Sequence, residues 1–276
     1  MPRLLTDKVL FITGASSGIG EATARAAAAA GMHVALFARR EDKLRQLAAD
    51  LETLGRRALV LPGDVTQPDD LAAAFDATWQ TFHRLDAAFA NAGYGLCVPM
   101  LDLTDEQHHA IFQTNYFATI HTLQRATPLL KRTPAGLRHL LVCSSAASEI
   151  GLPFYGAYAA TKAAQDAAAG ALRAELADEQ IHVTTVHPIG TTSEFFATVG
   201  QRSNRTFDHD TPNTPAFLAQ TPDHVARAIV KALRRPRPEV WPFWPVRFGL
   251  ALGTAFPRFA AWAMRRHYRQ GAGERP

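Results

Sequence analysis

Short apolar runs rich in β-branched residues alternate with helical patterns along most of this 276-residue chain. The apolar runs cover residues 9–13, 33–38, 58–61, 85–90, 137–144 and 181–186. Helical patterns follow the first five at 20–30, 41–54, 68–82, 104–130 and 158–178. Strands that alternate with helices build βαβ units, in which a parallel sheet is covered on both faces. The chain is therefore predicted to be α/β, with a doubly wound parallel sheet in a single domain.

The pattern changes after the sixth strand. Residues 197–220 are polar and contain Pro212 and Pro215, which is typical of a long loop. Thr221 followed by Pro222 predicts the start of a helix that runs to residue 233, and residues 239–243 predict a last strand. We therefore expect a dinucleotide-binding catalytic domain at 1–240, with 194–220 as a lid loop over the substrate, and a C-terminal helical tail at 241–276.

Composition excludes several other classes. Apolar residues make up 47% and charged residues 20% of the chain, close to an ordinary globular protein. No run of 18 apolar residues predicts a transmembrane helix. Cys97 and Cys143 are too few for a disulfide framework, and the first eight residues lack an apolar leader. These features predict a cytoplasmic protein.

A glycine-rich segment joins the first strand to the first helix. Gly14 permits the tight turn, Gly18 lets a pyrophosphate approach the backbone, and Gly20 lets the helix pack on the strand. The diphosphate is expected at the helix N-terminus, among free N–H groups and the positive end of the helix dipole. A connecting loop without a ligand is the alternative, and its place after the first strand favours the dinucleotide.

The end of the second strand bears on the cofactor. Folds that bind NAD usually place an acidic residue here, whereas this chain has Ala38 followed by Arg39 and Arg40. An arginine can stack on adenine and bind a 2′-phosphate, which favours NADP(H) over NAD(H). The alternative is a pair of solvated arginines at the start of a surface helix, with NAD as the second choice of cofactor. Glu41 and Asp42 are placed to begin that helix.

Several short motifs occur in a characteristic order. They are T-G-x-x-x-G-x-G at 13–20, Asp64-Val65, Ala90-Asn91-Ala92-Gly93, Asn115, Ser144-Ser145, Tyr158-x-x-x-Lys162 and Pro188-Ile189-Gly190-Thr191-Thr192-Ser193. With these motifs the chain resembles the short-chain dehydrogenase/reductase family over roughly residues 7–243, which implies a Rossmann-type fold. Ala90, Ile189 and Ser193 depart from the usual Asn, Gly and Thr of the family.

The resemblance assigns roles to these motifs. It implies cofactor contacts at Gly14, Ser16, Ser17, Gly18, Ile19, Gly20, Arg39, Arg40, Asp64, Val65, Asn91, Ala92, Gly93, Tyr158, Lys162, Pro188, Ile189, Gly190, Thr191 and Ser193. It also implies a catalytic set of Asn115, Ser145, Tyr158 and Lys162, in which Ser145 binds the substrate oxygen and Asn115 holds a water near Lys162.

The spacing of Tyr158 and Lys162 suits proton transfer. Hydride transfer to a carbonyl requires a proton donor, and an unperturbed phenol is a poor one at neutral pH. Lys162 lies one helical turn after Tyr158, so its charge is expected to lower the pKa of the phenol. Ser144 points to the other face of its strand, and Tyr155 lacks a lysine four residues later.

Apolar and aromatic residues cluster in the segments that follow the strands. They are Tyr94, Leu96, Ile150, Leu152, Phe154, Phe195, Phe196, Phe217 and Leu218. The eleven histidines show no zinc-binding spacing, so no metal is expected. The chain is thus predicted to be an NADP(H)-dependent oxidoreductase that acts on a hydrophobic ketone, aldehyde or alcohol. The alternative is a dinucleotide-binding sensor or scaffold without turnover.

The tail differs in charge from the rest of the chain. Residues 231–276 have a net charge of +8, whereas residues 1–230 have −4. Aromatic residues and arginines share the segment 241–269, with Arg258 and Trp262 on one side of a helix after Pro257. Such a helix is expected to pack on the domain or on a neighbouring subunit, and peripheral contact with a membrane surface is the alternative. Nucleic acid is not expected, since no second basic patch supports it.

Alanines along the helix at 158–178 bear on assembly. Small residues let two helices approach closely, and the resemblance implies dimers or tetramers formed through this helix and the one that holds Asn115. The alanines are Ala163, Ala164, Ala167, Ala168 and Ala171. A homo-oligomer is therefore predicted.

Overall fold

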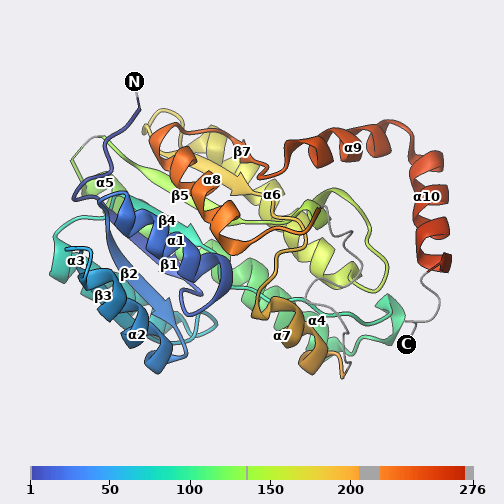
Figure 1. Cartoon of the computed structure of the whole chain (residues 1–276), viewed down its shortest axis with the longest axis horizontal. Coiled ribbons are helices and arrows are strands. Elements are labelled where there is room, and N and C mark those ends of the chain that lie inside the picture. Colours follow the sequence, from blue (N-terminus) through green and yellow to red (C-terminus); the bar gives the residue numbers. More distant parts are fainter. Residues whose placement is uncertain (1, 135, 205–217, 271–276) are drawn as a thin grey trace.

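The computed structural model of the protein describes residues 2–134, 136–204 and 218–270, with the backbone alone for 267–270. Seven strands lie within this part of the chain and form one parallel sheet of order β3-β2-β1-β4-β5-β6-β7 (Figure 1). They are β1 (Val9–Thr13), β2 (His33–Ala38), β3 (Ala58–Pro62), β4 (Ala87–Ala90), β5 (His139–Cys143), β6 (His182–Val186) and β7 (Glu239–Val240). The predicted last strand is real but short, because it ends at Val240.

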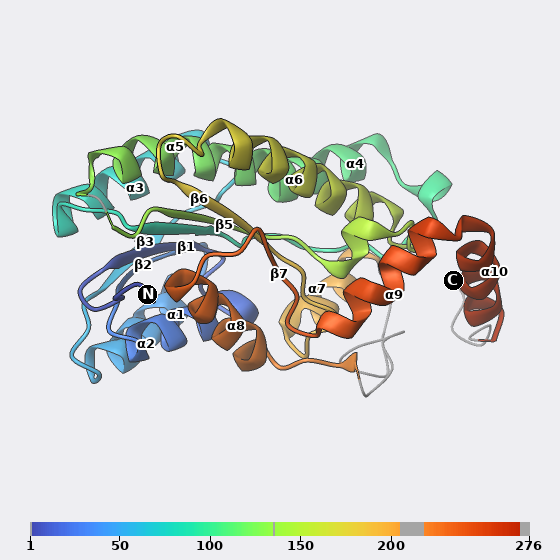
Figure 2. The ribbon, with the colours of Figure 1, turned by 90° about the horizontal axis from the view of Figure 1, so that it is seen from above.

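Helices cover both faces of the sheet, as the alternation predicts (Figure 2). One face carries α3 (Pro68–Phe82), α5 (Ala118–Arg132) and α6 (Gly156–Glu175), and the other carries α1 (Gly18–Ala29), α2 (Glu41–Glu52) and α8 (Pro222–Arg234). Each face of the sheet has its own apolar core. Leu10, Ile12 and Leu36 pack on the side of α1 and α8. Phe11, Leu140 and Val142 pack on the side of α3 and α5. This alternation of side chains along each strand confirms the doubly wound sheet.

The predicted helix at 104–130 consists of three parts. It comprises α4 (Asp105–Phe112), a π-helical turn η2 (Gln113–Phe117) and α5, which continues to Arg132. Thr104 begins it with a capping box, since its side chain accepts from the Gln107 N–H and the Gln107 side chain accepts from the Thr104 N–H. The sequence gives no sign of the π turn, which surrounds Asn115.

The structure corrects the expectation of a loop over 197–220. Residues 194–202 form the helix α7 (Glu194–Arg202), whose first turn is capped by the side chain of Ser193. The apolar residues Phe196 and Val199 are buried and hold this helix against the domain. Residues 205–217 of the predicted lid lie outside the described residues. The segment predicted as a lid therefore begins with a helix rather than with a loop.

The tail contains two helices where the sequence predicts one. They are α9 (Trp244–Ala255) and α10 (Pro257–Gln270), and they extend from the end of the molecule that holds α7 (Figure 1). The short 3-10 helices η1 (Met100–Asp102) and η3 (Ala146–Glu149) also belong to this end of the chain fold. No helix in the described part of the chain is both long enough and apolar enough to span a membrane.

Candidate active site

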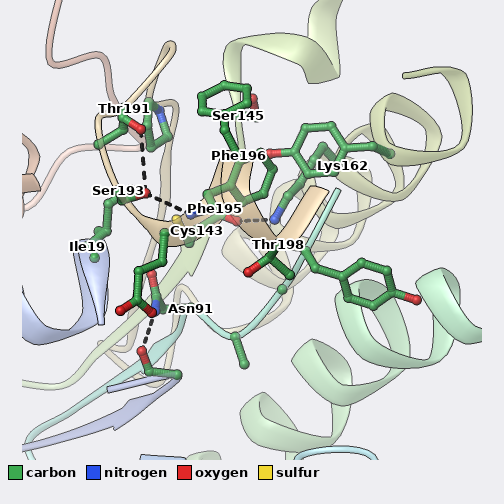
Figure 3. A pocket seen from close by; sticks show the side chains of 18 of the residues that line it. Ile19, Asn91, Cys143, Ser145, Lys162, Thr191, Ser193, Phe195, Phe196 and Thr198 are labelled. Carbon is green, nitrogen blue, oxygen red and sulfur yellow. Dashed lines mark hydrogen bonds between the residues drawn. The ribbon is translucent and has the colours of Figure 1, made fainter. Parts of the chain in front are cut away.

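One large cavity lies where the strands β1, β4, β5 and β6 end (Figure 3). Its volume is about 680 Å³, and its lining runs from the glycine loop to α9. Nearly every predicted site residue lines it: Gly14, Ser16, Ser17, Gly18, Ile19, Arg39, Arg40, Asp64, Val65, Asn91, Ala92, Gly93, Ser145, Tyr158, Lys162, Pro188, Ile189, Gly190, Thr191 and Ser193. Gly20 and Asn115 do not line it, and both lie directly behind residues that do.

The glycine loop has the backbone that its sequence predicts. Gly14 has a φ of 66° and Gly18 a φ of 57°, in the left-handed region that favours glycine. A Cβ on Gly20 would lie 2.2 Å from the carbonyl oxygen of Gly14, so only glycine fits there. Asn91 Nδ2 donates to the Thr13 carbonyl at 3.0 Å and ties the end of β4 to this loop. The N-terminus of α1 thus opens into the cavity, a fitting place for a diphosphate.

The two arginines after β2 have different partners. Arg39 is largely exposed, and its guanidinium lies 3.9 Å from the carboxylate of Asp64. Arg40 Nε donates to Ser16 Oγ at 3.2 Å, and Arg40 Nη1 forms an ion pair with Glu194 at 2.8 Å. Arg40 therefore links the glycine loop to α7. Glu194 is a residue that the motifs do not identify, because its partner is distant in the sequence.

Tyr158 lies in the first turn of α6 and lines the cavity, where its side chain is hydrogen-bonded to Ser145. Burial raises the pKa of Tyr158 above its usual value, and the hydrogen bond with Ser145 opposes that shift. The sequence predicts that Lys162 lowers the pKa of Tyr158, but the effect of burial on this pKa is larger and of opposite sign. The phenol is therefore protonated at neutral pH.

Lys162 is almost fully buried below Tyr158. Its ammonium donates to the carbonyl oxygen of Cys143 at 2.7 Å and lies 5.6 Å from the centre of the Tyr158 ring. Burial lowers the pKa of Lys162, while Cys143 and Asp166 act in the opposite direction. Loss of solvent thus makes this lysine a better proton carrier than an exposed one.

Asn115 is buried behind the cavity rather than exposed in it. Its Oδ1 accepts from the Tyr94 N–H at 3.0 Å, and its Nδ2 donates to Tyr94 O and Thr161 Oγ1. A Cβ on Gly93 would meet Asn115 Oδ1 at 3.1 Å and Lys162 Nζ at 3.6 Å. Asn115 and Lys162 therefore both lie close to Gly93.

Further polar groups lie behind Ser145. Glu149, Asp166 and His187 bring ligand atoms within 4.8 Å of one another, although they come from η3, α6 and the end of β6. His187 Nδ1 lies 3.4 Å from the Ser145 carbonyl and 3.7 Å from Asp166 Oδ2. Histidine spacing could not indicate this cluster, because its members are far apart in the sequence.

The opposite wall of the cavity is apolar. Of the predicted wall residues, Tyr94, Ile150, Leu152, Phe195, Phe196 and Leu218 line it. Leu96 and Phe154 do not: Leu96 packs in a buried cluster with Ile111, and Phe154 packs beside Cys97. Phe217 lies outside the described residues. The Phe195 ring lies 5.6 Å from that of Tyr158, so the apolar wall begins at the phenol.

Several lining residues were missed from the sequence. Val246 and Leu250 of α9 close the wall, so the tail packs partly on its own domain. The guanidinium of Arg202 lies 3.9 Å from the Tyr94 ring centre at the same cavity. Tyr155 and Cys143 also line it. Only the three-dimensional arrangement brings α7 and α9 to this place.

Known proteins resemble the chain in sequence. Residues 8–204 match the family described as short chain dehydrogenase. The oxidoreductase asL5 of Sarocladium schorii is 32% identical over 209 residues, which cover 75% of this chain and 82% of asL5. Dehydrogenase/reductase SDR family member 7B of Xenopus tropicalis is 31% identical over 245 residues, 86% of this chain and 77% of that protein.

Solved structures also resemble the chain in fold. An alcohol dehydrogenase from Thermococcus sibiricus, complexed with 5-hydroxy-NADP, has a TM-score of 0.74 at 29% identity and covers 85% of this chain and 95% of its own. A short-chain dehydrogenase/reductase from Burkholderia phymatum, in complex with NAD, has a TM-score of 0.79 at 20% identity over 93% and 96% of the two chains, and so shows the shared fold. Sequence and fold agree: the chain belongs to the short-chain dehydrogenase/reductase family of oxidoreductases.

Proposed function

We propose that the chain transfers a hydride between NADP(H) and a hydrophobic carbonyl or secondary alcohol, with Tyr158 as the acid and base. The observation that carries this proposal is the partly buried Tyr158 phenol, hydrogen-bonded to Ser145 in a cavity that the glycine loop also lines. A sensor or scaffold has no need for a protonated phenol at this place. Turnover is therefore favoured over cofactor binding alone.

The residues divide the work of carbonyl reduction. Ser145 Oγ and the Tyr158 hydroxyl bind the substrate oxygen, and Tyr158 gives its proton to that oxygen as negative charge develops there. Lys162 then returns a proton to the phenolate from the polar interior around Asn115. When bound, the nicotinamide supplies the hydride in this direction and accepts it in the reverse one.

Cofactor choice is assigned to the arginines after β2. Arg39 and Arg40 line the end of the cavity next to β2, where Ala38 leaves no carboxylate for a ribose hydroxyl. The exposed Arg39 guanidinium is free to turn from Asp64 toward a 2′-phosphate. Asp64 and Val65 would hold the adenine, and Thr191 and Ser193 the nicotinamide half. The Thermococcus sibiricus relative was solved with an NADP derivative.

The substrate is inferred from the wall opposite Tyr158. Ile150, Leu152, Phe196 and Leu250 offer no charge to a ligand, so burial of apolar surface would supply most of the binding energy. A carbonyl on a bulky hydrocarbon frame suits this wall better than a charged or sugar-like substrate.

Assembly and location follow from other surfaces. Ala163, Ala167 and Ala171 are exposed along α6, which supports a homo-oligomer formed through this helix. The chain contains only two cysteines, which supports a reducing, cytoplasmic setting. Light scattering at micromolar concentration tests the oligomer, and a monomeric mass would remove it.

A substrate panel tests the central proposal. The purified protein is given NADPH with ketones and aldehydes of increasing apolar size, and NADP⁺ with the matching alcohols. Oxidation of NADPH that rises with substrate hydrophobicity is expected. Binding of the cofactor with no turnover across the panel would favour the sensor instead.

A further inference from the structure

The tail helices carry a concentrated apolar surface. Trp244, Phe248 and Leu252 recur every four residues on α9, with exposed fractions of 72%, 62% and 45%. Phe256, between the two helices, and Phe259 and Trp262 on α10 have exposed fractions of 62%, 65% and 55%. These six side chains, here called the tail face, are six of the eleven large hydrophobic residues exposed in the described part of the chain. Such a concentration of exposed apolar side chains on two successive helices indicates a partner.

Arginines are interleaved with the tail face. Arg258, Trp262 and Arg266 are spaced four residues apart on α10, so they share one side of the helix. The Arg266 guanidinium lies 5.7 Å from the Trp262 ring centre. Neither Arg258 nor Arg266 has a carboxylate partner within the described residues, and residues 241–270 contain no Asp or Glu. The partner of this face is therefore apolar and anionic at once.

A second copy of the chain is a poor occupant. In a two-fold contact the tail face would meet itself, so Arg258 and Arg266 would approach arginines without any acidic residue between them. An anionic bilayer provides both chemistries: phosphates bind arginines, and the interface accepts Trp and Phe rings. α9 and α10 also form the outermost elements at one end of the molecule, where a flat surface can reach them (Figures 1 and 2).

We propose that the tail face docks the protein on an anionic lipid surface. The rings of α9 and α10 enter the interface, and Arg258 and Arg266 bind lipid headgroups. An apolar groove of about 700 Å³ lies between these helices and the loop after η3, lined by Ile150, Pro153, Phe154, Gly253, Ala260 and Met264. Ile150 also lines the main cavity, so the groove beside the tail helices borders the site of the proposed reaction.

Flotation of the full-length protein with vesicles tests the docking. Phosphatidylcholine vesicles that contain phosphatidylserine should carry the protein upward, whereas pure phosphatidylcholine should carry much less. Arg258→Gln with Arg266→Gln should weaken partition about 30-fold, at roughly fivefold for each arginine near an anionic surface. Trp244→Ser with Phe248→Ser should weaken it by about 30-fold or more, because two rings lose their burial.

Matched controls make the test decisive. Leu54→Ser with Arg45→Gln removes an exposed apolar side chain and an exposed arginine near α2, far from the tail, and should leave partition unchanged. Circular dichroism checks each fold; if the ring variant unfolds, the arginine variant alone carries the test. Wild-type protein that stays at the bottom, or variants that float equally well, overturn the proposal. A drop in oligomer mass in the ring variant, without flotation of the wild type, would assign the face to a second copy instead.

Discussion

The helices α6 and α9 differ in a way that composition does not foresee. α9 is the more apolar of the two helices, and its polar residues are Arg247 and Thr254. Nevertheless, none of its residues, all of which lie in the described part of the chain, is buried. α6 buries Lys162, Gln165 and Thr161. The difference comes from how each helix is connected to the sheet. α6 joins the neighbouring parallel strands β5 and β6, so it must pack across them. α9 follows the edge strand β7 and leads to no further strand of the sheet.

Burial on α6 is made tolerable by hydrogen bonds. Gln165 Nε2 donates to Asn115 O at 2.6 Å and to Thr119 Oγ1 at 2.7 Å, and Lys162 has the Cys143 carbonyl. Each bond replaces one that the group would make with water, which offsets part of the cost of burial. The comparison shows that α6 carries buried polar side chains of the site, whereas α9 presents exposed apolar side chains.

The largest expected effect concerns the acid on α6. Tyr158→Phe should lower kcat about 1000-fold or more, since a general acid contributes about 10²–10⁴-fold, while NADPH affinity stays within about twofold. Tyr155→Phe, a change in the neighbouring phenol that also lines the cavity, should keep at least about a tenth of the turnover. Steady-state kinetics and cofactor titration measure both. More than about a tenth of kcat left in Tyr158→Phe would refute the assignment.

The next prediction concerns the effect of the exposed residue Arg39 on cofactor affinity. NADPH should bind about 10- to 1000-fold more tightly than NADH, since each charge-assisted bond to a phosphate contributes about 1.5–3 kcal/mol. Arg39→Ala should remove most of this difference, and Arg45→Ala, an exposed arginine on α2, should not. Titration with both cofactors decides, and equal affinities in the wild type would make Arg39 an ordinary surface residue.

The sheet below α6 should respond to acid. Burial lowers the pKa of His139 from about 6.5 to about 3, so the folded protein keeps this histidine neutral while the unfolded chain protonates it. Above pH 6.5 this histidine is neutral in both states and does not change the free energy of unfolding. As the pH drops from 6.5 toward 3, the free energy of unfolding falls by up to about 1.4 kcal/mol per pH unit. Denaturation at several pH values should show a shallower slope for His139→Gln. Identical slopes would contradict the burial.

The smallest effect compares the two helices directly. A Cβ would meet nothing within 4 Å at Gly170 on α6 or at Gly249 on α9. Each change to alanine favours the helix by about 0.5–1 kcal/mol. Gly170→Ala should raise the free energy of global unfolding by that amount, whereas Gly249→Ala should leave it unchanged, because α9 opens separately. Equal gains in denaturant titrations would show that α9 unfolds with the domain.

Local pattern predicted most of the fold. The first six strands were found within a few residues, because alternating apolar runs and glycine-terminated helices are read from neighbouring positions. The helix α7 was missed, since its stability depends on contacts of Phe196 and Val199 with distant segments. α9 was missed for a different reason, because Pro242 and Pro245 obscure its start.

The site was predictable where a motif is local. The glycine loop, Tyr158 and Lys162 lie within short segments, and the structure brings them to one cavity. The pairing of Arg40 with Glu194 and the convergence of Glu149, Asp166 and His187 depend on how separate elements meet. The pKa of Tyr158 was misjudged because charge spacing is visible in a sequence and burial is not.

The π turn around Asn115 sets the number of residues in its helix. The Asn115 carbonyl accepts from Thr119 Oγ1 and Gln165 Nε2. A π turn holds one residue more than the α-helical turn it replaces, so deleting one residue from 113–117 would restore a uniform α-helix without turning α4 or α5. Asn115 itself would then move to another position on that turn and lose the hydrogen bonds that hold its side chain against Tyr94 and Thr161. The extra residue thus fixes the direction of the Asn115 side chain, a constraint on chain length that a regular helix would not impose.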